Sequence, residues 1–157
     1  MGRGKLKVFE VDLRWLRDFL FEVKVADFSE FYMDELEPEG HDSAPNPADY
    51  LLVSIGGCTA SSFVYAARKF GVPIEKVNVK VRGRYVRKKG MVRIGLVDVE
   101  VEAFHSSMSE EDLENLEWCI KVFRKYCVIS ESLREGLPIH VTLKVNGETI
   151  EVPTPEE

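Results

Sequence analysis

Three cysteines are the residues of this chain best suited to chemistry: Cys58, Cys119 and Cys127. A thiolate can act as a nucleophile, form a disulfide or bind a metal. Structural zinc sites need paired ligands at short spacing, but the chain has no Cys-x-x-Cys pair and its three histidines are scattered. We therefore expect no metal site, and the question is whether these thiols react or only pack.

Cys58 directly follows a glycine pair, Gly56-Gly57, inside a segment that is predicted to be helical. Each mid-helix glycine destabilises the helix by about 1 kcal/mol relative to alanine, so something should offset this cost. Glycine lets another backbone or a ligand approach closely, which makes the adjacent thiol a candidate site. A cysteine can also serve as a small apolar residue at a tight helix crossing. From these residues alone, packing is the preferred interpretation.

Cys127 stands at the end of a second predicted helix, which Ser109 caps and which carries acids in its first turn. It continues the apolar stripe of that helix, so it should face the interior or the first helix. Two thiols on facing helices can join if their Cα atoms lie within about 4.4–6.8 Å, which spacing alone does not show. Cys119 flanks the stripe and is expected to be a core residue. The stripe consists of Leu113, Leu116, Ile120, Phe123 and Cys127.

The helix that carries Cys58 has clear ends. Asn46 is a good N-cap, Pro47 suits the first helical position and Asp49 lies in the first turn. Gly71 ends the helix. Between these ends the segment is apolar almost all round, which is typical of a helix buried in a core or an interface.

Strands are predicted on both sides of the two helices. Residues 10–34 alternate in two runs, and residues 77–83 and 92–101 form a hairpin that turns at Lys89-Gly90. A last hairpin joins residues 139–145 to 149–152 through Asn146-Gly147, a strong turn signal. This order predicts an α+β fold with mostly antiparallel sheets, and one domain over residues 1–157.

Composition narrows the class of protein. The chain has 157 residues, a net charge of −6 and 45% hydrophobic residues, so nucleic acid is not an expected partner. No apolar run reaches the roughly 18 residues of a membrane span, and no apolar stretch follows the basic N-terminus, so we expect no membrane partner and a cytoplasmic location. Abundant Glu, Lys and Arg without any Gln are typical of heat-adapted proteins.

The segment from Ala44 to Thr59 resembles a motif of the OsmC/Ohr family, the osmotically inducible protein C and organic hydroperoxide resistance proteins. The shared pattern is a proline, an acid, an aliphatic run and then two small residues before Cys58. Lys125-Tyr126-Cys127 resembles the second cysteine of that family, and the likeness extends over roughly residues 10–150. The resemblance implies an intertwined homodimer, in which two long central helices pack between antiparallel sheets from both chains.

The resemblance also implies a reaction, the reduction of organic hydroperoxides. Cys58 would attack the peroxide as a thiolate and become a sulfenic acid, Cys127 would form a disulfide with it, and an external dithiol would reduce the pair. No metal, haem or flavin is implied. Two other interpretations stay open: an OsmC-like protein that binds a small or lipid-like molecule without turnover, and a stress-related protein whose cysteines are inert.

Two further residues complete the expected site. The family activates its thiolate with an arginine from the N-terminal hairpin, for which Arg17 is the best candidate and Arg14 the second. In the peroxidase branches a glutamate that holds this arginine follows the first proline of the helix, but here Ala48 stands at that position. Asp49 is the nearest carboxylate, although on an ideal helix it lies about 180° away from Cys58. A first-turn acid that stabilises the helix is its preferred interpretation.

Overall fold

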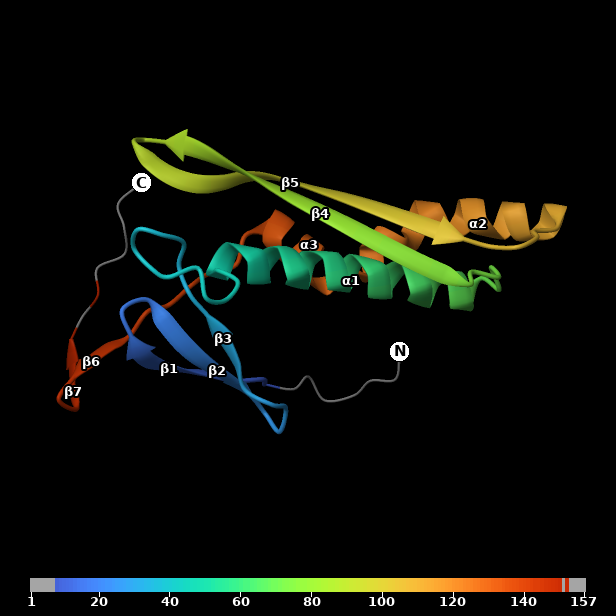
Figure 1. The fold of residues 1–157 in the computed structure, drawn as a ribbon. Helices are drawn as coiled ribbons and strands as arrows, with labels where there is room; N and C mark the ends of the chain where they lie inside the picture. Colours follow the sequence, from blue (N-terminus) through green and yellow to red (C-terminus); the bar gives the residue numbers. More distant parts are fainter. Residues whose placement is uncertain (1–7, 151, 153–157) are drawn as a thin grey trace.

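The computed structural model describes residues 8–150 and 152, and it shows an α+β fold with antiparallel sheets (Figure 1). A three-stranded sheet comes first, followed by a long helix, a long hairpin, a segment of short helices and a small C-terminal hairpin. In order, the elements are β1 (Val11–Arg17), β2 (Leu20–Val25), β3 (Phe31–Met33), α1 (Pro47–Lys69), β4 (Lys76–Lys88), β5 (Met91–Phe104), α2 (Glu110–Val122), the 3-10 helix η1 (Phe123–Tyr126), α3 (Val128–Glu135), β6 (Leu143–Val145) and β7 (Glu148–Ile150).

Helix α1 begins and ends where the sequence predicts. The Asn46 side chain accepts a hydrogen bond from the Asp49 N–H at 3.0 Å, and Asp49 Oδ2 accepts one from the Asn46 N–H at 3.1 Å. This reciprocal capping box satisfies two N–H groups that have no partner within the helix. At the other end Gly71 adopts φ 72°, a left-handed conformation that suits glycine.

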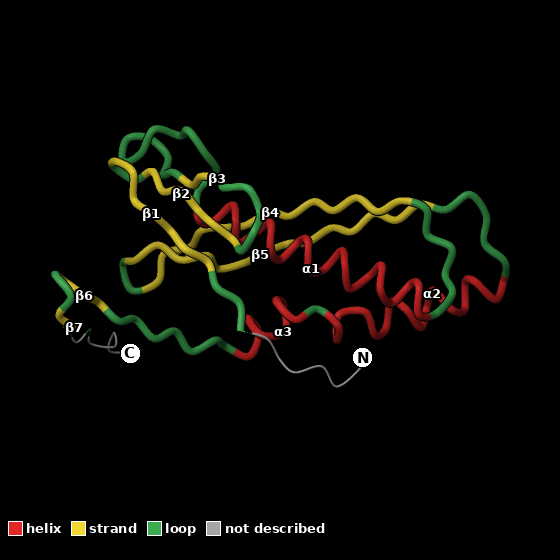
Figure 2. Tube along the Cα trace, turned by 90° about the horizontal axis from the view of Figure 1, so that it is seen from below, coloured by secondary structure: helices red, strands yellow, loops and turns green. Residues whose placement is uncertain are grey.

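Helix α1 packs between the β4–β5 hairpin and the segment made of α2, η1 and α3 (Figure 2). The buried core gathers at its C-terminal half, where the rings of Phe63 and Phe123 meet edge to face at 5.7 Å. Cys119 lies fully buried in this core, as predicted, and burial raises the pKa of its thiol.

Helix α1 is also long and apolar enough to span a membrane by length and composition, a test that core helices pass as well.

The second helix is shorter than predicted. Helix α2 ends at Val122, a 3-10 turn follows, and Cys127 is extended with φ −80° and ψ 93°. A 3-10 turn has about three residues per turn, so it breaks the helical phase on which the predicted stripe depended. Within α2, the stripe residues Leu113 and Ile120 are exposed in this chain, at 51% and 55%, whereas Cys127 beyond the break is buried.

The two predicted hairpin turns are confirmed, but the strands differ in length. Lys89 and Gly90 have φ 50° and 78°, and Asn146 and Gly147 have φ 51° and 86°, as two-residue hairpin turns require. Strands β4 and β5 run 13 and 14 residues, longer than predicted. The C-terminal strand predicted over 139–145 is reduced to Leu143–Val145. Within the described part of this chain, the missing stretch has no neighbouring strand with which to pair.

A buried carboxylate fixes the loop that leads into α1. Asp34 is 1% exposed and accepts hydrogen bonds from the Ser43 hydroxyl at 2.7 Å and from the backbone N–H groups of Glu35, His41 and Ser43. The Ser43 hydroxyl is the main cause of a lowered Asp34 pKa, against the opposing effect of burial. These bonds hold the ends of the loop together just before the N-terminus of α1.

Candidate active site

The structure brings Cys58 and Cys127 together. Cys58 lies half-buried in the middle of α1, and Cys127 is 1% exposed at the junction between η1 and α3. The Cys58 side chain lies close enough to the Cys127 thiol to lower its pKa, and both cysteines are free thiols. Two thiols that are 69 positions apart in the chain therefore share one small site between two helical elements.

Cys127 occupies the N-cap position of α3, and Ser130 is its closest polar partner. The Cys127 thiol donates to Ser130 Oγ at 3.0 Å, and its Sγ lies 3.7 Å from Thr59 Oγ1. Burial raises the pKa of Cys127, but hydrogen bonds with Ser130, Cys58 and Thr59 outweigh it and leave the pKa below its ordinary value. A helix N-terminus also favours a thiolate, since the helix dipole is positive there.

Two buried hydroxyl side chains, those of Thr59 and Ser62, lie on α1 close to Cys58. Thr59 Oγ1 donates to the Ile55 carbonyl at 2.8 Å, and Ser62 Oγ donates to the Cys58 carbonyl at 2.7 Å. Backbone carbonyls four residues earlier therefore satisfy both hydroxyl protons. The hydroxyls can stay buried beside the thiols without a water or ligand partner.

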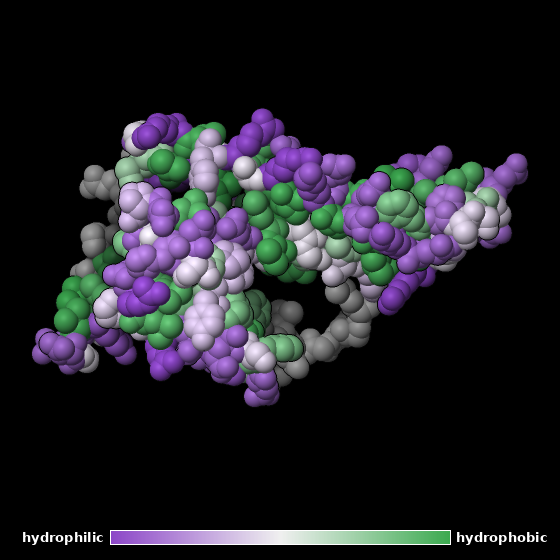
Figure 3. All heavy atoms as spheres, viewed as in Figure 1, coloured by the Kyte–Doolittle hydropathy of each residue, from purple (hydrophilic) through white to green (hydrophobic). Residues whose placement is uncertain are grey.

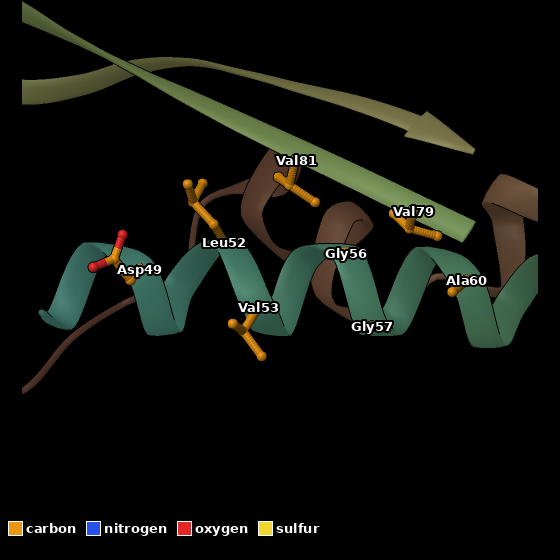
Figure 4. A pocket seen from close by; sticks show the side chains of 8 residues that line it. All are labelled: Asp49, Leu52, Val53, Gly56, Gly57, Ala60, Val79 and Val81. Carbon is orange, nitrogen blue, oxygen red and sulfur yellow. The ribbon is translucent and has the colours of Figure 1, made fainter. Parts of the chain in front are cut away.

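The two glycines before Cys58 have different surroundings. A Cβ on Gly56 would lie 2.6 Å from a methyl group of Val81, so this glycine allows close packing of α1 on β4. A Cβ on Gly57 would meet nothing within 4 Å. Gly57 borders an open groove of about 400 Å³ between α1 and β4 (Figure 4). The groove is mainly apolar and is lined by Asp49, Leu52, Val53, Gly56, Gly57, Ala60, Val79 and Val81.

Neither candidate arginine contacts a thiol within the described residues of this protomer. Arg17 ends β1 and is exposed, with Nη1 3.7 Å from Asp18 Oδ2. Arg14 donates to Glu22 at 2.9 Å, and this hydrogen bond raises the pKa of Arg14. The activating role of Arg17 stays a prediction.

Asp49 is part of the α1 capping box and borders one end of the groove, away from the thiol pair. Its Oδ2 accepts from the Asn46 N–H, which agrees with the interpretation as a helix-terminal acid. Its catalytic role stays a prediction that the capping geometry disfavours.

Replacing Asp49 with asparagine is expected to leave peroxide consumption within about twofold of the wild-type rate. It should lower the free energy of unfolding by up to about 1 kcal/mol, because the charge at the helix N-terminus is lost. Asp112→Asn is the matched control, since Asp112 forms the same capping box with Ser109 at the start of α2. A tenfold fall in rate for Asp49→Asn alone, with a raised thiol pKa, would restore Asp49 to the catalytic set.

Sequence reasoning missed Ser130 and Thr59, the two hydroxyl residues that contact Cys127. A signal for Ser130 is present: it stands three residues after Cys127, followed by the acid Glu131, and Gly136 ends the segment. This is the pattern of a short helix with Cys127 at its N-cap. The longer apolar stripe of the preceding helix obscured it.

The comparisons with known proteins agree with this fold. The sequence model of one family, described as OsmC-like protein, matches residues 40–142. Comparison with curated protein sequences gives no significant match.

Several solved structures share the fold at low sequence identity. An OsmC-like protein of unknown function from Vibrio cholerae has a TM-score of 0.70 and 15% identity, over 81% of this chain and 94% of that one. An organic hydroperoxide resistance protein OsmC from Legionella pneumophila has a TM-score of 0.64 and 15% identity, over 83% and 92%. The organic hydroperoxide resistance protein OhrB of Bacillus subtilis has a TM-score of 0.60 and 16% identity, over 83% and 93%. The TM-scores show that these proteins share the fold of this chain, and identities this low show nothing beyond the fold.

Proposed function

Because this chain belongs to the OsmC-like protein family, we propose that it is a thiol-dependent peroxidase that reduces organic hydroperoxides with Cys58 and Cys127. The observation that carries the proposal is that the two free thiols share one site between α1 and the start of α3, where the Cys127 sulfur lies 3.7 Å from the hydroxyl of Thr59, the residue after Cys58. Two relatives by fold are named as organic hydroperoxide resistance proteins, which supports the same reaction.

The proposed cycle moves two electrons and needs no bound cofactor. The Cys58 thiolate attacks the outer oxygen of the hydroperoxide, so that an S–O bond forms, the O–O bond breaks and the alcohol leaves. The sulfenic acid on Cys58 is then attacked by Cys127, which forms the disulfide and releases water. An external dithiol reduces the disulfide by thiol–disulfide exchange and restores both thiols.

The groove between α1 and β4 favours an organic substrate. Its lining is mostly apolar and includes Gly57, the residue before Cys58. An alkyl or aryl group on the peroxide would gain about 25 cal/mol for each Å² of apolar surface that it buries there. The same groove also favours the second candidate function, the binding of a small lipid-like molecule without turnover.

One assay separates the two functions. Reduced protein is mixed with cumene hydroperoxide or hydrogen peroxide and excess dithiothreitol, and the loss of peroxide is followed. The peroxidase proposal predicts catalytic consumption and a preference for cumene hydroperoxide. If neither peroxide is consumed but a fatty acid raises the melting temperature, the binding function replaces it.

We also propose that the working protein is a homodimer, because a single chain leaves much apolar surface exposed. The apolar side chains are spread over β1, the outer face of α1 and the extended segment that leads to β6. On the face drawn in Figure 3, hydrophobic residues lie among hydrophilic ones. Val53 on α1 is 67% exposed and Ile139 is 84% exposed. Exposed apolar surface on this scale marks an interaction site. The main contributors are Leu13, Trp15, Val53, Leu137, Ile139 and Val141.

Light scattering during gel filtration at micromolar concentration should therefore give a mass of about twice the 17.9 kDa of one chain. A dimer that covers these segments is expected to bury more than about 2,000 Å², so it should persist on dilution. The added strand partner would also explain why the stretch before Leu143 pairs with none of the strands between residues 8 and 150. A stable, folded monomer at this concentration would contradict the assembly.

A further inference from the structure

The two thiols of the site have unequal surroundings. The Cys127 sulfur lies at the N-terminus of α3, 3.0 Å from the Ser130 hydroxyl and 3.7 Å from the Thr59 hydroxyl. Cys58 lies in the middle of α1, where the helix uses its own backbone N–H groups for the hydrogen bonds between its turns. The groups that can stabilise a negative sulfur are therefore gathered around Cys127, although the resemblance assigns the attack on peroxide to Cys58.

Ser130 is suited to stabilise either state of Cys127. A serine hydroxyl can accept from a thiol and, after rotation, donate to a thiolate. Thr59 is more restricted, because its proton is already donated to the Ile55 carbonyl at 2.8 Å. Ser130 is thus the side chain that can keep a hydrogen bond to Cys127 in both protonation states, as acceptor from the thiol and as donor to the thiolate.

The other charged groups on the surrounding elements have partners of their own or lie exposed. Cys58 is the titratable side chain that lies close enough to the Cys127 sulfur to lower the pKa of Cys127. On α1, η1 and α3, Lys69 donates to Tyr126 at 2.8 Å, and Glu131 is paired with Arg134 at 2.7 Å. The exposed charged groups on these elements are Asp49, Arg68, Arg124, Lys125 and Glu135. Cys119 on α2 is fully buried, and burial raises its pKa.

We propose that Ser130 positions Cys127 as the proton acceptor for Cys58, so that one sulfur serves first as a base and then as the resolving nucleophile. This inference rests on the proposed peroxidase function. It gives the site a base in a chain where Ala48 stands at the position of the glutamate that holds the activating arginine in the peroxidase branches. Ser130 acts through Cys127 and is a positioning residue.

The proton and the bonds balance at each step. The Cys58 thiol passes its proton to the Cys127 thiolate, and the Cys58 sulfur attacks the hydroperoxide. An S–O bond forms, the O–O bond breaks, and the departing alkoxide takes the proton from Cys127 and leaves as the alcohol. Cys127, again a thiolate, attacks the Cys58 sulfenic sulfur, so that an S–S bond forms, the S–O bond breaks and hydroxide leaves.

The test compares Ser130→Thr with Ser130→Val, two side chains of the same shape that differ in the hydroxyl. Thiolate absorbance near 240 nm is recorded against pH, and disulfide formation is timed after one equivalent of cumene hydroperoxide. The thiolate transition of the Ser130→Thr variant should occur at the same pH as that of the wild-type protein. Valine should move the Cys127 transition upward by about one pH unit and slow disulfide formation at pH 7 about tenfold, with the difference vanishing above both transitions. Ser132→Val on the same helix should change neither.

The proposal is overturned if the threonine and valine variants titrate together, or if their rates differ equally at every pH. Ser130→Ala adds a third comparison if either branched side chain disturbs the fold, and circular dichroism identifies such a variant. The titration needs no peroxide. A wild-type protein that consumes no peroxide would therefore remove the peroxidase function, while the thiolate titration would still decide whether Ser130 sets the protonation of Cys127.

Discussion

Replacing Cys58 with serine is expected to abolish peroxide turnover, with a loss of at least about a thousandfold in the steady-state rate with cumene hydroperoxide and dithiothreitol. A serine hydroxyl in mid-helix is not ionised at neutral pH and cannot form a sulfenic acid, so neither the attack nor the disulfide remains. Removal of a covalent nucleophile produces losses of this size or larger in other enzymes. The fold should persist, because Cys58 is half-buried and serine is of similar size.

Cys119→Ala is the matched control for this result. Cys119 is as deeply buried as Cys127, but it belongs to the core around Phe63 rather than to the thiol pair. The control should keep turnover near the wild-type rate and lose only stability, since a small cavity replaces the sulfur. Turnover that survives in Cys58→Ser, or that disappears in a folded Cys119→Ala protein, would contradict the assignment of Cys58.

Replacing Cys127 with serine is expected to stop the cycle after one oxidation. Cys58 should accumulate as a sulfenic acid that a dimedone probe labels, and turnover with a dithiol should fall about a hundredfold. The reason is proximity: a thiol held against Cys58 acts at an effective concentration far above that of a reductant in solution. The first oxidation should also be slower, since serine is a poor proton acceptor.

Mass spectrometry of the labelled peptides measures this outcome. The label should be confined to Cys58 in the Cys127→Ser variant and be absent from the wild-type protein, where the disulfide forms first. Label on Cys119 would contradict the roles of both residues. Wild-type turnover in Cys127→Ser would show that Cys58 is resolved by the external dithiol alone.

Local signals in the sequence predict the parts of the fold that local contacts determine. The start of α1 depends on Asn46 and Asp49, which lie within one turn of each other, and the turn at Asn146-Gly147 depends on two adjacent residues. The packing of Cys119 also follows from its position beside an apolar stripe. These features need no knowledge of the rest of the chain.

The features that were missed depend on contacts between distant segments. The break after Val122 places Cys127 at the start of α3 instead of the end of α2, and only then does Ser130 reach its sulfur. The short C-terminal strand has a similar cause, because the stretch around Ile139 has no strand partner in the part of this chain that the structure describes. Periodicity within one segment carries no information about such partners.

The contact between Cys58 and Cys127 also depends on tertiary structure, although the family resemblance made the pair an expectation. Gly56 contributes by letting α1 approach Val81 closely, which fixes the helix against the β4–β5 hairpin. Gly57 instead borders open space, since apart from its own stretch of α1 no atom of the described residues lies within 4 Å of where its Cβ would be. In the proposed dimer, this space beside Cys58 is available to a substrate or to the partner subunit.

The most direct test of a Cys58–Cys127 peroxidase is a stoichiometric titration of the reduced protein with cumene hydroperoxide. Free thiols are counted after each addition, and the cysteine peptides are mapped without reduction. One equivalent of peroxide should remove two thiols per chain, form the Cys58–Cys127 disulfide and leave Cys119 free. Peroxide that remains unconsumed, or a product in which Cys58 and Cys127 are not joined, would contradict the peroxidase function of this pair.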